Sequence, residues 1–401
     1  MLVLVTIITV FSISIVLYHH IAYPLILKKA SVARKWPHYK DDRCYKSHEW
    51  DSKLPSVTLI VPAFHEEEFV AQKIYNLATL DYPKEKLKVL IYCDGCEDDT
   101  YKNATETKNS ILCSSLDIEV KDVEKNRGKV SSLNRIIPHV TSDIVGLSDV
   151  SALLSVDSLL IAAKLFQDEK VGVVAGTYDF LLSGSDGEKI YWNYQRNIKK
   201  GESALGGPIG AHGAFYMFKS QLFSALEADT VNDDFIIPMQ IMGMGYRAVY
   251  EPEIMALELE QADLNVDFKR RCRIAQGNIQ QVFRLKHLLH PKHKGVAFTF
   301  VSGKVLRAFM PIFMIVALIG SFCLTFCENS IIFWIFGLGF LGQALGYSIA
   351  MLPTFRPNTE FPKAIQSVNY LVSGYIAGLV GIVAYCKNIQ CKTNAPWKRV
   401  H

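Results

Sequence analysis

The sequence predicts an α/β fold with a mostly parallel sheet, attached to membrane-spanning helices. Two observations support this prediction. From Pro55 onward, short apolar segments typical of strands alternate with segments of helical periodicity, which indicates a parallel sheet covered by helices on both faces. In addition, apolar runs near both ends of the chain are long enough to cross a bilayer.

The N-terminal apolar run has the features of an uncleaved anchor. Leu2 to Tyr18 contains no charged residue, and the basic residues follow it rather than precede it: Lys28, Lys29, Arg34 and Lys35. A signal peptide would have the basic residues first and a small-residue cleavage site. We therefore predict a transmembrane anchor over residues 1–27, with the N-terminus outside and the basic side in the cytoplasm.

Three further apolar runs predict a C-terminal transmembrane region over residues 305–386, of about three helices. They are Val305–Phe326, Ile331–Leu352 and Ala364–Cys386. Residues 266–304 are expected to form interfacial helices, and residues 387–401 a basic tail. Four spans would place this tail outside, whereas its charges favour the cytoplasm. We expect a cytoplasmic tail, with one C-terminal run interfacial or re-entrant.

Residues 37–265 lie between these regions and are expected to form a cytoplasmic enzymatic or binding domain. The net charge of +4 is too small to indicate a nucleic-acid partner, and aromatic residues are not interleaved with a basic stripe. The nine cysteines are scattered and odd in number, which argues against a disulfide scaffold.

The predicted elements of this domain follow one another in a regular order. Strands are expected at 56–64, 88–93, 118–123, 143–147 and 171–178, and helices at 66–80, 98–110, 130–140 and 156–167. The carboxyl ends of parallel strands meet at one edge of a sheet, where ligands bind. Glu66, Asp94 and Asp149 follow three of these strands. Carboxylates so placed favour a metal ion, a ribose hydroxyl or a nucleobase edge.

The segment LIYCDGCEDDT, residues 90–100, contains Cys93 and Cys96 beside four acidic residues. A redox pair would be hindered by the adjacent negative charge, which raises a thiol pKa. A zinc site would need two more ligands at suitable spacing, and none is evident. We therefore assign the function of this segment to its carboxylates. Neither a GxGxxG fingerprint after the first strand nor a P-loop occurs.

Six motifs in order resemble those of the inverting family 2 glycosyltransferases, and among them the membrane-embedded synthases of hyaluronan, chitin, cellulose and poly-N-acetylglucosamine. The motifs are VPAFHEEEFV, DGCEDDT, NRGKVSSLN, SDVSALL, NDDF and KRRCRIAQGN. The resemblance covers nearly the whole chain, because the one-plus-three arrangement of apolar runs is also similar. It implies a Rossmann-like nucleotide-sugar-binding domain of the GT-A type.

The resemblance implies a donor site for a nucleotide sugar, with a uridine diphosphate sugar expected. Its residues would be Pro62, Ala63, Glu66, Asp94, Lys129, Asp149 and Arg273. The family's DxD motif, which binds ribose and a divalent metal, here reads Asp149-Val150-Ser151. The resemblance thus implies Mg²⁺ or Mn²⁺ bound by Asp149 and Ser151, with one protein carboxylate plus substrate phosphates.

The same resemblance implies that Asp234 is the general base and that the acceptor meets His212, Gly213, Asp233 and Ile274. Plainer roles remain open for some of these residues. Asp233 or Asp234 could cap a helix beginning at Phe235, and His212 could be a buried, hydrogen-bonded core residue. Ile274 stands where the family has a tryptophan, and Arg270, which stands where it has a glutamine, could face lipid headgroups.

The implied function is transfer of a sugar, with inversion, onto a growing cell-surface polysaccharide or its oligosaccharide precursor. The enzyme would be a multi-pass protein of the cell membrane with its catalytic domain in the cytoplasm. Two alternatives remain: a non-processive transferase acting on a membrane lipid, and a catalytically silent homologue that binds glycan or nucleotide. With Ile274 in place of tryptophan, we expect short products or single additions.

Overall fold

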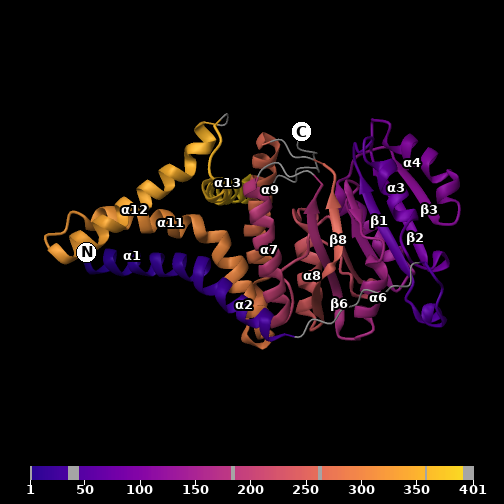
Figure 1. Ribbon diagram of the computed structural model, residues 1–401, viewed down its shortest axis with the longest axis horizontal. Helices are drawn as coiled ribbons and strands as arrows, with labels where there is room; N and C mark the ends of the chain where they lie inside the picture. The colour runs from indigo at the N-terminus through magenta and orange to yellow at the C-terminus, as the bar shows by residue number, and fades with distance from the viewer. Residues whose placement is uncertain (1, 35–44, 182–185, 261–263, 357–358, 392–401) are drawn as a thin grey trace.

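The computed structural model describes residues 2–34, 45–181, 186–260, 264–356 and 359–391. The predicted domain start at residue 37 and the tail residues 392–401 lie outside these ranges. Figure 1 shows a globular α/β domain at one end, a slender group of helices at the other, and α13 (Lys363–Cys391) between them.

In the described residues, eight strands form one sheet in the order β3-β2-β1-β4-β7-β6-β8-β5. The prediction of a mostly parallel sheet is confirmed: β3, β2, β1 and β4 run parallel, and β6 runs parallel to β8. The antiparallel pairings are those of β7 with β4 and β6, and of β5 with β8. The strands are β1 Val57–Ala63, β2 Leu87–Asp94, β3 Asp117–Val123, β4 Ile144–Ser148, β5 Ala152–Leu154, β6 Val171–Phe180, β7 Phe215–Lys219 and β8 Arg247–Glu258.

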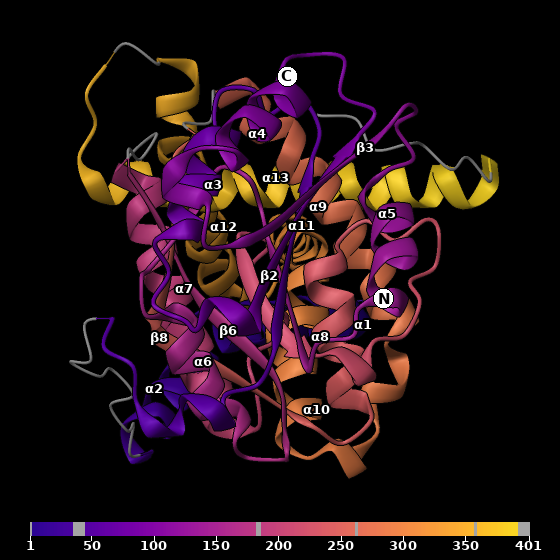
Figure 2. The same cartoon turned by 90° about the vertical axis from the view of Figure 1, so that its right-hand side faces the viewer.

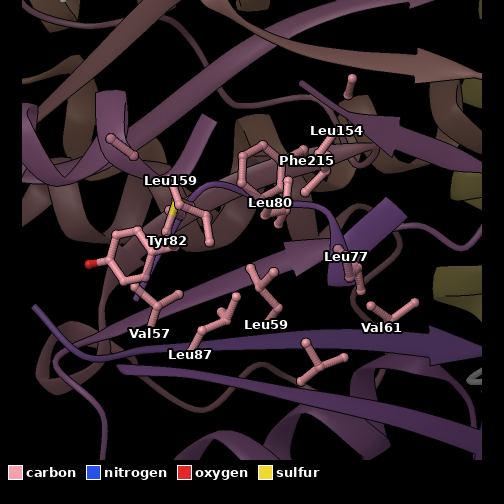
Figure 3. Packing of buried hydrophobic residues seen from close by; sticks show 14 of the residues in the cluster. Val57, Leu59, Val61, Leu77, Leu80, Tyr82, Leu87, Leu154, Leu159 and Phe215 are labelled. Carbon is pink, nitrogen blue, oxygen red and sulfur yellow. The ribbon is translucent and has the colours of Figure 1, made fainter. Parts of the chain in front are cut away.

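The core lies on both faces of this sheet, which explains why β1 is a continuous apolar run rather than an alternating one. Val57, Leu59 and Val61 pack on one face, as Figure 3 shows, whereas Ile60 joins the cluster on the other face. All seven residues of β1 are buried.

Helices cover the sheet close to where the sequence predicts them. They are α3 Val70–Ala78, α4 Thr100–Lys108, α5 Lys129–Ile136, α6 Ser158–Phe166 and α8 Asp233–Gly243. Helix α3 begins at Val70 rather than at Glu66, because the amides of Phe69 and Val70 both donate to the Glu66 carbonyl and form a turn first. The three glutamates that follow β1 thus belong to a loop.

In the part of the chain that the structure describes, four helices are long and apolar enough to cross a membrane: Leu2–Ala33, Gly295–Leu324, Ser330–Phe355 and Lys363–Lys387. The first and second exceed their predicted limits at residues 27 and 305, because π-helical turns join them to neighbouring helices instead of breaking them. Their parts are α1 Leu2–Leu17, α2 Tyr23–Ala33, α10 Gly295–Thr299 and α11 Leu306–Leu324; Ser330–Phe355 is α12.

Helix α13 lies crosswise to α1 and α11. It is seen end-on in Figure 1, where α1 and α11 run along the page, and lengthwise in Figure 2. It packs on α7 (Asp186–Leu205) and α9 (Leu264–Arg284), the two long helices of the domain that face the membrane helices. The layer formed by α7, α9 and α13 therefore separates the sheet from α1, α11 and α12.

Candidate active site

A cavity of about 1540 Å³ lies between the carboxyl edge of the sheet and this helical layer. It collects most of the side chains that the sequence singles out. The predicted residues that line it are Pro62, Glu66, Lys129, Asp149, Ser151, His212, Gly213, Asp233, Asp234, Arg273 and Ile274. Ala63 and Asp94 are not among the lining residues.

Lys129 links two of the predicted carboxylates. Its Nζ lies 3.2 Å from Asp149 Oδ1 and 3.5 Å from Asp233 Oδ2. Burial alone would raise the pKa of Asp149, but the charge of Lys129 and its hydrogen bond outweigh burial and lower that pKa. Asp149 is therefore ionised at neutral pH and can bind a cation.

Asp94 does not line the cavity. Its carboxylate instead holds the loop that precedes Lys129. Its carboxylate accepts hydrogen bonds from the amides of Arg127 and Gly128, the latter at 2.8 Å. The neighbouring Gly95 has φ +72°, and a Cβ there would lie 2.3 Å from the amide nitrogen of Asn126. Ala63 and Asp94 do not line the cavity, and their direct contact with the donor stays a prediction.

Gly213 separates Asp149 from Asp234. A Cβ added at Gly213 would lie 3.3 Å from Asp149 Oδ2 and 3.5 Å from Asp234 Oδ2. The two carboxylates thus converge on one point, and the absence of a side chain at residue 213 leaves that point open. Close approach of a ligand to both carboxylates requires this glycine.

Asp234 is in the first turn of α8, which begins at Asp233 with Asn232 as its N-cap residue. The alternative that Asp233 or Asp234 caps a helix starting at Phe235 is therefore wrong. Burial, and then the charge of Asp233, raise the pKa of Asp234 to about 6. A carboxylate with such a pKa accepts a proton more readily than an ordinary aspartate.

His212 sits in an aromatic cluster next to these carboxylates. Its ring stacks on Tyr178 with centroids 3.7 Å apart and meets Trp192 edge-on at 5.1 Å. Its Nδ1 accepts from the amide of Ala214 at 3.2 Å, which leaves the proton on Nε2. Burial and the charge of Arg270 lower the pKa of His212 to about 3, so the ring is neutral and can donate from Nε2.

Helix α9 supplies the basic residues of the last motif. Arg270, Arg273 and Ile274 line the cavity, so the interpretation of Arg270 as a headgroup-facing residue is wrong. Arg271 points away: it donates to the Tyr370 carbonyl and lies 3.6 Å above the Tyr370 ring, which fastens α9 to α13. Ile274 is 38 % exposed toward the cavity and presents no aromatic face.

Comparison with known proteins agrees with this geometry. Residues 55–277 match the family model described as glycosyltransferase like family 2. The chain belongs to this family. It is a glycosyltransferase, as the resemblance implies.

Curated relatives of this glycosyltransferase include poly-beta-1,6-N-acetyl-D-glucosamine synthases. The protein of Staphylococcus aureus strain COL is 26 % identical over 240 residues, and that of Staphylococcus epidermidis is 24 % identical over 240 residues. Each match covers 58 % of this chain and 57 % of the relative, so the chain spans little more than half the length of these relatives.

A solved structure shares the fold over nearly the whole chain. The mannosyltransferase PcManGT from Pyrobaculum calidifontis, in complex with GDP-Man and Mn²⁺, aligns with a TM-score of 0.67 and 21 % sequence identity. The alignment covers 93 % of this chain and 99 % of that one. The GT-A-like fold is thus confirmed, with helices long and apolar enough to span a membrane.

The glycosyltransferase site offers donors suited to a divalent cation. The ionised Asp149 and the Ser151 hydroxyl both line the cavity, and Glu258 lines it as well. Burial and the Asp149 charge raise the pKa of Glu258 while the Ser151 hydroxyl lowers it, which places both close to this carboxylate. Among the described residues, no group of three His, Cys, Asp or Glu side chains could hold a metal. The arrangement fits Mg²⁺ or Mn²⁺, which use one or two carboxylates plus substrate phosphates.

Two residues close to Asp149 were not predicted from the sequence. Glu258 ends β8, a strand the sequence analysis did not predict. Lys73 is fully buried, and its Nζ donates to Ser148 Oγ at 2.6 Å and to the Ala152 carbonyl, on either side of Asp149. Lys73 lies on the apolar face of α3 formed by Val70, Ile74 and Leu77. A lysine on an apolar helix face was the signal that could have identified it.

Proposed function

We propose that this glycosyltransferase moves a sugar from a nucleotide-sugar donor, with a uridine diphosphate sugar expected, onto a cell-surface polysaccharide or its oligosaccharide precursor. The observation that carries the proposal is the convergence of Asp149 and Asp234 on the open point beside Gly213. One carboxylate is suited to the metal-bound diphosphate and the other to the acceptor hydroxyl. The curated synthase relatives support a polysaccharide product.

In the proposed reaction, Asp234 accepts the proton of the acceptor hydroxyl. The hydroxyl oxygen forms a bond to the anomeric carbon from the face opposite the diphosphate, the bond to the diphosphate oxygen breaks, and the nucleoside diphosphate leaves. This single displacement inverts the anomeric centre. A divalent cation held by Asp149 and Ser151, with Glu258 close by, would neutralise charge that develops on the diphosphate. Arg273, also in the cavity, would bind the phosphates.

The catalytically silent alternative is disfavoured by the pKa of Asp234. A site that only binds nucleotide has no need of a carboxylate whose pKa is raised to about 6 and which faces the same open point as an ionised partner. Nucleic acid is not a proposed partner.

A transfer assay with the purified full-length chain in detergent would test the proposal. A panel of labelled uridine and guanosine diphosphate sugars is supplied with Mn²⁺, and nucleoside diphosphate release is measured with and without membrane extract as acceptor. We expect acceptor-stimulated release with one donor and a β-linked product by NMR. Asp234→Asn serves as the matched inactive control. If the wild-type protein releases nucleoside diphosphate from every donor no faster than Asp234→Asn does, the proposed transfer from a nucleotide sugar is wrong.

A further inference from the structure

The cavity continues beyond the carboxylates to the membrane helices, and at this second end three cations line it. They come from three different segments: Lys199 from α7, Lys304 from the π-helical turn Phe300–Val305, and Arg307 from α11. The rings of Tyr191 and Tyr375 line the same end. This end is built by helices of the membrane-facing layer and by the start of a candidate membrane span.

The contacts of these cations within the described residues are with neutral groups. Lys199 Nζ donates to the carbonyls of Ile209 and Gly210 at 3.3 and 3.0 Å. Lys304 Nζ donates to Asn278 Oδ1 at 2.8 Å and lies 3.7 Å from the centroid of the Phe235 ring.

Arg307 likewise donates to neutral oxygens, those of Gln195 and Tyr191. Removing three positive charges from water is costly unless an opposite charge compensates them. The residues that surround Lys304 and Arg307 supply hydrogen bonds but no salt bridge in the described part of the chain.

Glu202 and Asp234 are the acidic residues whose charges act on both lysines of this cluster, and the oxygens of Glu202 are already engaged. Tyr23 donates to Oε1 and the Ile209 amide to Oε2, each at 3.0 Å. Burial is the main influence on Glu202 and raises its pKa. Even with Asp234 included, two carboxylates do not balance three cations, so this end of the cavity retains an excess of positive charge.

Gln281 adds an independent sign of a missing ligand. It is 0 % exposed and lines the cavity, and neither its amide nitrogen nor its oxygen has a hydrogen-bond partner among the described residues. It lies one helical turn beyond Asn278 on α9, and Asn278 is the partner of Lys304. A buried amide without partners is unfavourable, and a bound polar group would satisfy it.

We propose that Lys199, Lys304 and Arg307 bind the phosphate or diphosphate of a lipid-linked acceptor, whose hydrocarbon chain lies among the membrane helices. Phosphate is the anion that three convergent cations suit, and lipid phosphates lie at the membrane surface, where α11 begins. In the proposed function, the donor diphosphate would have its own partners in the cavity, namely Arg273 and a cation that Asp149 would hold.

The proposal rests on the transferase function and narrows its acceptor. A phosphate oxygen is already ionised at neutral pH and needs no base. The presence of Asp234 as a base therefore indicates that the reacting group is a hydroxyl of a sugar attached to the lipid phosphate. Asp234 is close enough for its charge to act on Lys199 and Lys304, so such a sugar would reach it.

Binding to the full-length protein in phosphatidylcholine nanodiscs would test the proposal without any transfer step. The probes are farnesyl diphosphate, farnesol and inorganic pyrophosphate, each titrated in EDTA so that the metal-dependent donor site is not engaged. We expect farnesyl diphosphate to bind at least about tenfold more tightly than either of the other two. Arg307→Gln and Lys304→Gln should each weaken the binding of farnesyl diphosphate about tenfold, and Arg307→Lys should weaken it less. Lys292 is exposed, so Lys292→Gln is the control and should leave the affinity unchanged.

Equal binding of farnesol and farnesyl diphosphate would overturn the proposal, as would an unchanged affinity in the two glutamine variants. Equal binding of pyrophosphate would show that a free phosphate compound, not a lipid, is the ligand. A second series with saturating uridine diphosphate and Mn²⁺ reports on the donor site and on folding of each variant. Loss of lipid binding in this series would place the headgroup in the donor site. If the nucleotide-release assay fails while farnesyl diphosphate binds as expected, the transferase function is wrong and the lipid site stands.

Discussion

Asp233 and Asp234 are adjacent in the sequence, but their surroundings give them different tasks. Asp233 Oδ2 lies 3.5 Å from Lys129 Nζ, whereas Asp234 faces Gly213 and the open point of the cavity. The charge of Asp233 is the largest influence after burial that raises the pKa of Asp234. The charge of Asp233 therefore helps to set the pKa of Asp234.

Asp234→Asn should lower sugar transfer by at least about 10²-fold, since it retains the size of the side chain but removes the proton acceptor. Nucleoside diphosphate affinity, measured by calorimetry with Mn²⁺, should stay near that of the wild type. Asp233→Asn is the matched control and should be the milder change. The opposite order of effects would mean that the base is Asp233.

The pH dependence of transfer should report the raised pKa of Asp234. The base must be ionised, so kcat/KM should rise with pH through about 6 and then level off. Asp233→Asn removes a negative charge that raises this pKa, so the acid limb of the profile should move to lower pH. If the acid limb of the profile does not move in Asp233→Asn, the charge of Asp233 does not raise the pKa of the base.

Binding of the divalent metal should depend on the carboxylate of Asp149. Asp149→Ala should abolish the Mn²⁺-dependent part of nucleoside diphosphate binding, because the ionised carboxylate is lost. Glu258→Gln should weaken Mn²⁺ binding, and Ser151→Asp should leave it intact or strengthen it. Electron paramagnetic resonance of Mn²⁺ with uridine diphosphate would measure each. Full transfer in excess chelator would exclude the metal role altogether.

At the scale of secondary structure, the sequence predicts β1, β2, β3, β4 and β6, because apolar periodicity and strand ends are local signals. It does not predict β5, β7 or β8. The gathering of Glu66 and Asp149 at one sheet edge follows from parallel pairing of β1 with β4. The turn of Asp94 toward the 126–128 loop depends instead on backbone amides distant in sequence, which no local pattern encodes. Lys304 and Gln281 could not be predicted for the same reason, since their role depends on tertiary placement, whereas Lys73 has a local signal in the apolar face of α3.

The orientation of α13 was also beyond sequence pattern, because an apolar helix of this length is compatible with either a span or an interfacial position. Because α13 lies crosswise to α1 and α11, we expect α1, α11 and α12, rather than α13, to cross the bilayer. An external N-terminus followed by three crossings ends in the cytoplasm, which agrees with the basic residues of the tail.

A reporter fused after His401 should therefore be active in the cytoplasm. Paired phosphatase and fluorescent-protein fusions, each active on only one side of the membrane, would measure this. The control is the same pair fused at Asn329, between α11 and α12, which should report the opposite side. A tail reporter active outside would mean that α13 crosses the bilayer.

At the scale of the whole molecule, product length depends on how firmly the acceptor is held between additions. An aromatic contact contributes about 0.5 to 1.5 kcal/mol beyond buried area, which is roughly a twofold to twelvefold change in acceptor retention. Ile274 lacks this contact. Trp192 also lines the cavity, and its indole nitrogen has no hydrogen-bond partner in the described ranges. Trp192 is packed against His212 and Tyr178, which restricts the face it can offer.

We therefore expect short products from the wild-type enzyme at saturating donor, and longer ones from Ile274→Trp. Trp192→Leu tests the other ring: if it shortens the products, Trp192 serves as a platform for the acceptor. Gel filtration of labelled glycan would measure the lengths. A high-molecular-weight polymer from the purified wild-type protein would show that isoleucine is compatible with processive synthesis.

The extent of the cavity has a consequence for what the cell must provide. Its described lining reaches into α11 only as far as Ala308 and includes no residue of α12. Farther along, α1 and α11 are in close contact, since a Cβ on Gly320 would lie 2.1 Å from Thr9 Oγ1. Within the described residues, the cavity therefore does not continue between these helices toward their far ends. If the product is a cell-surface glycan, as proposed, we expect a separate flippase or transporter to carry it across the bilayer.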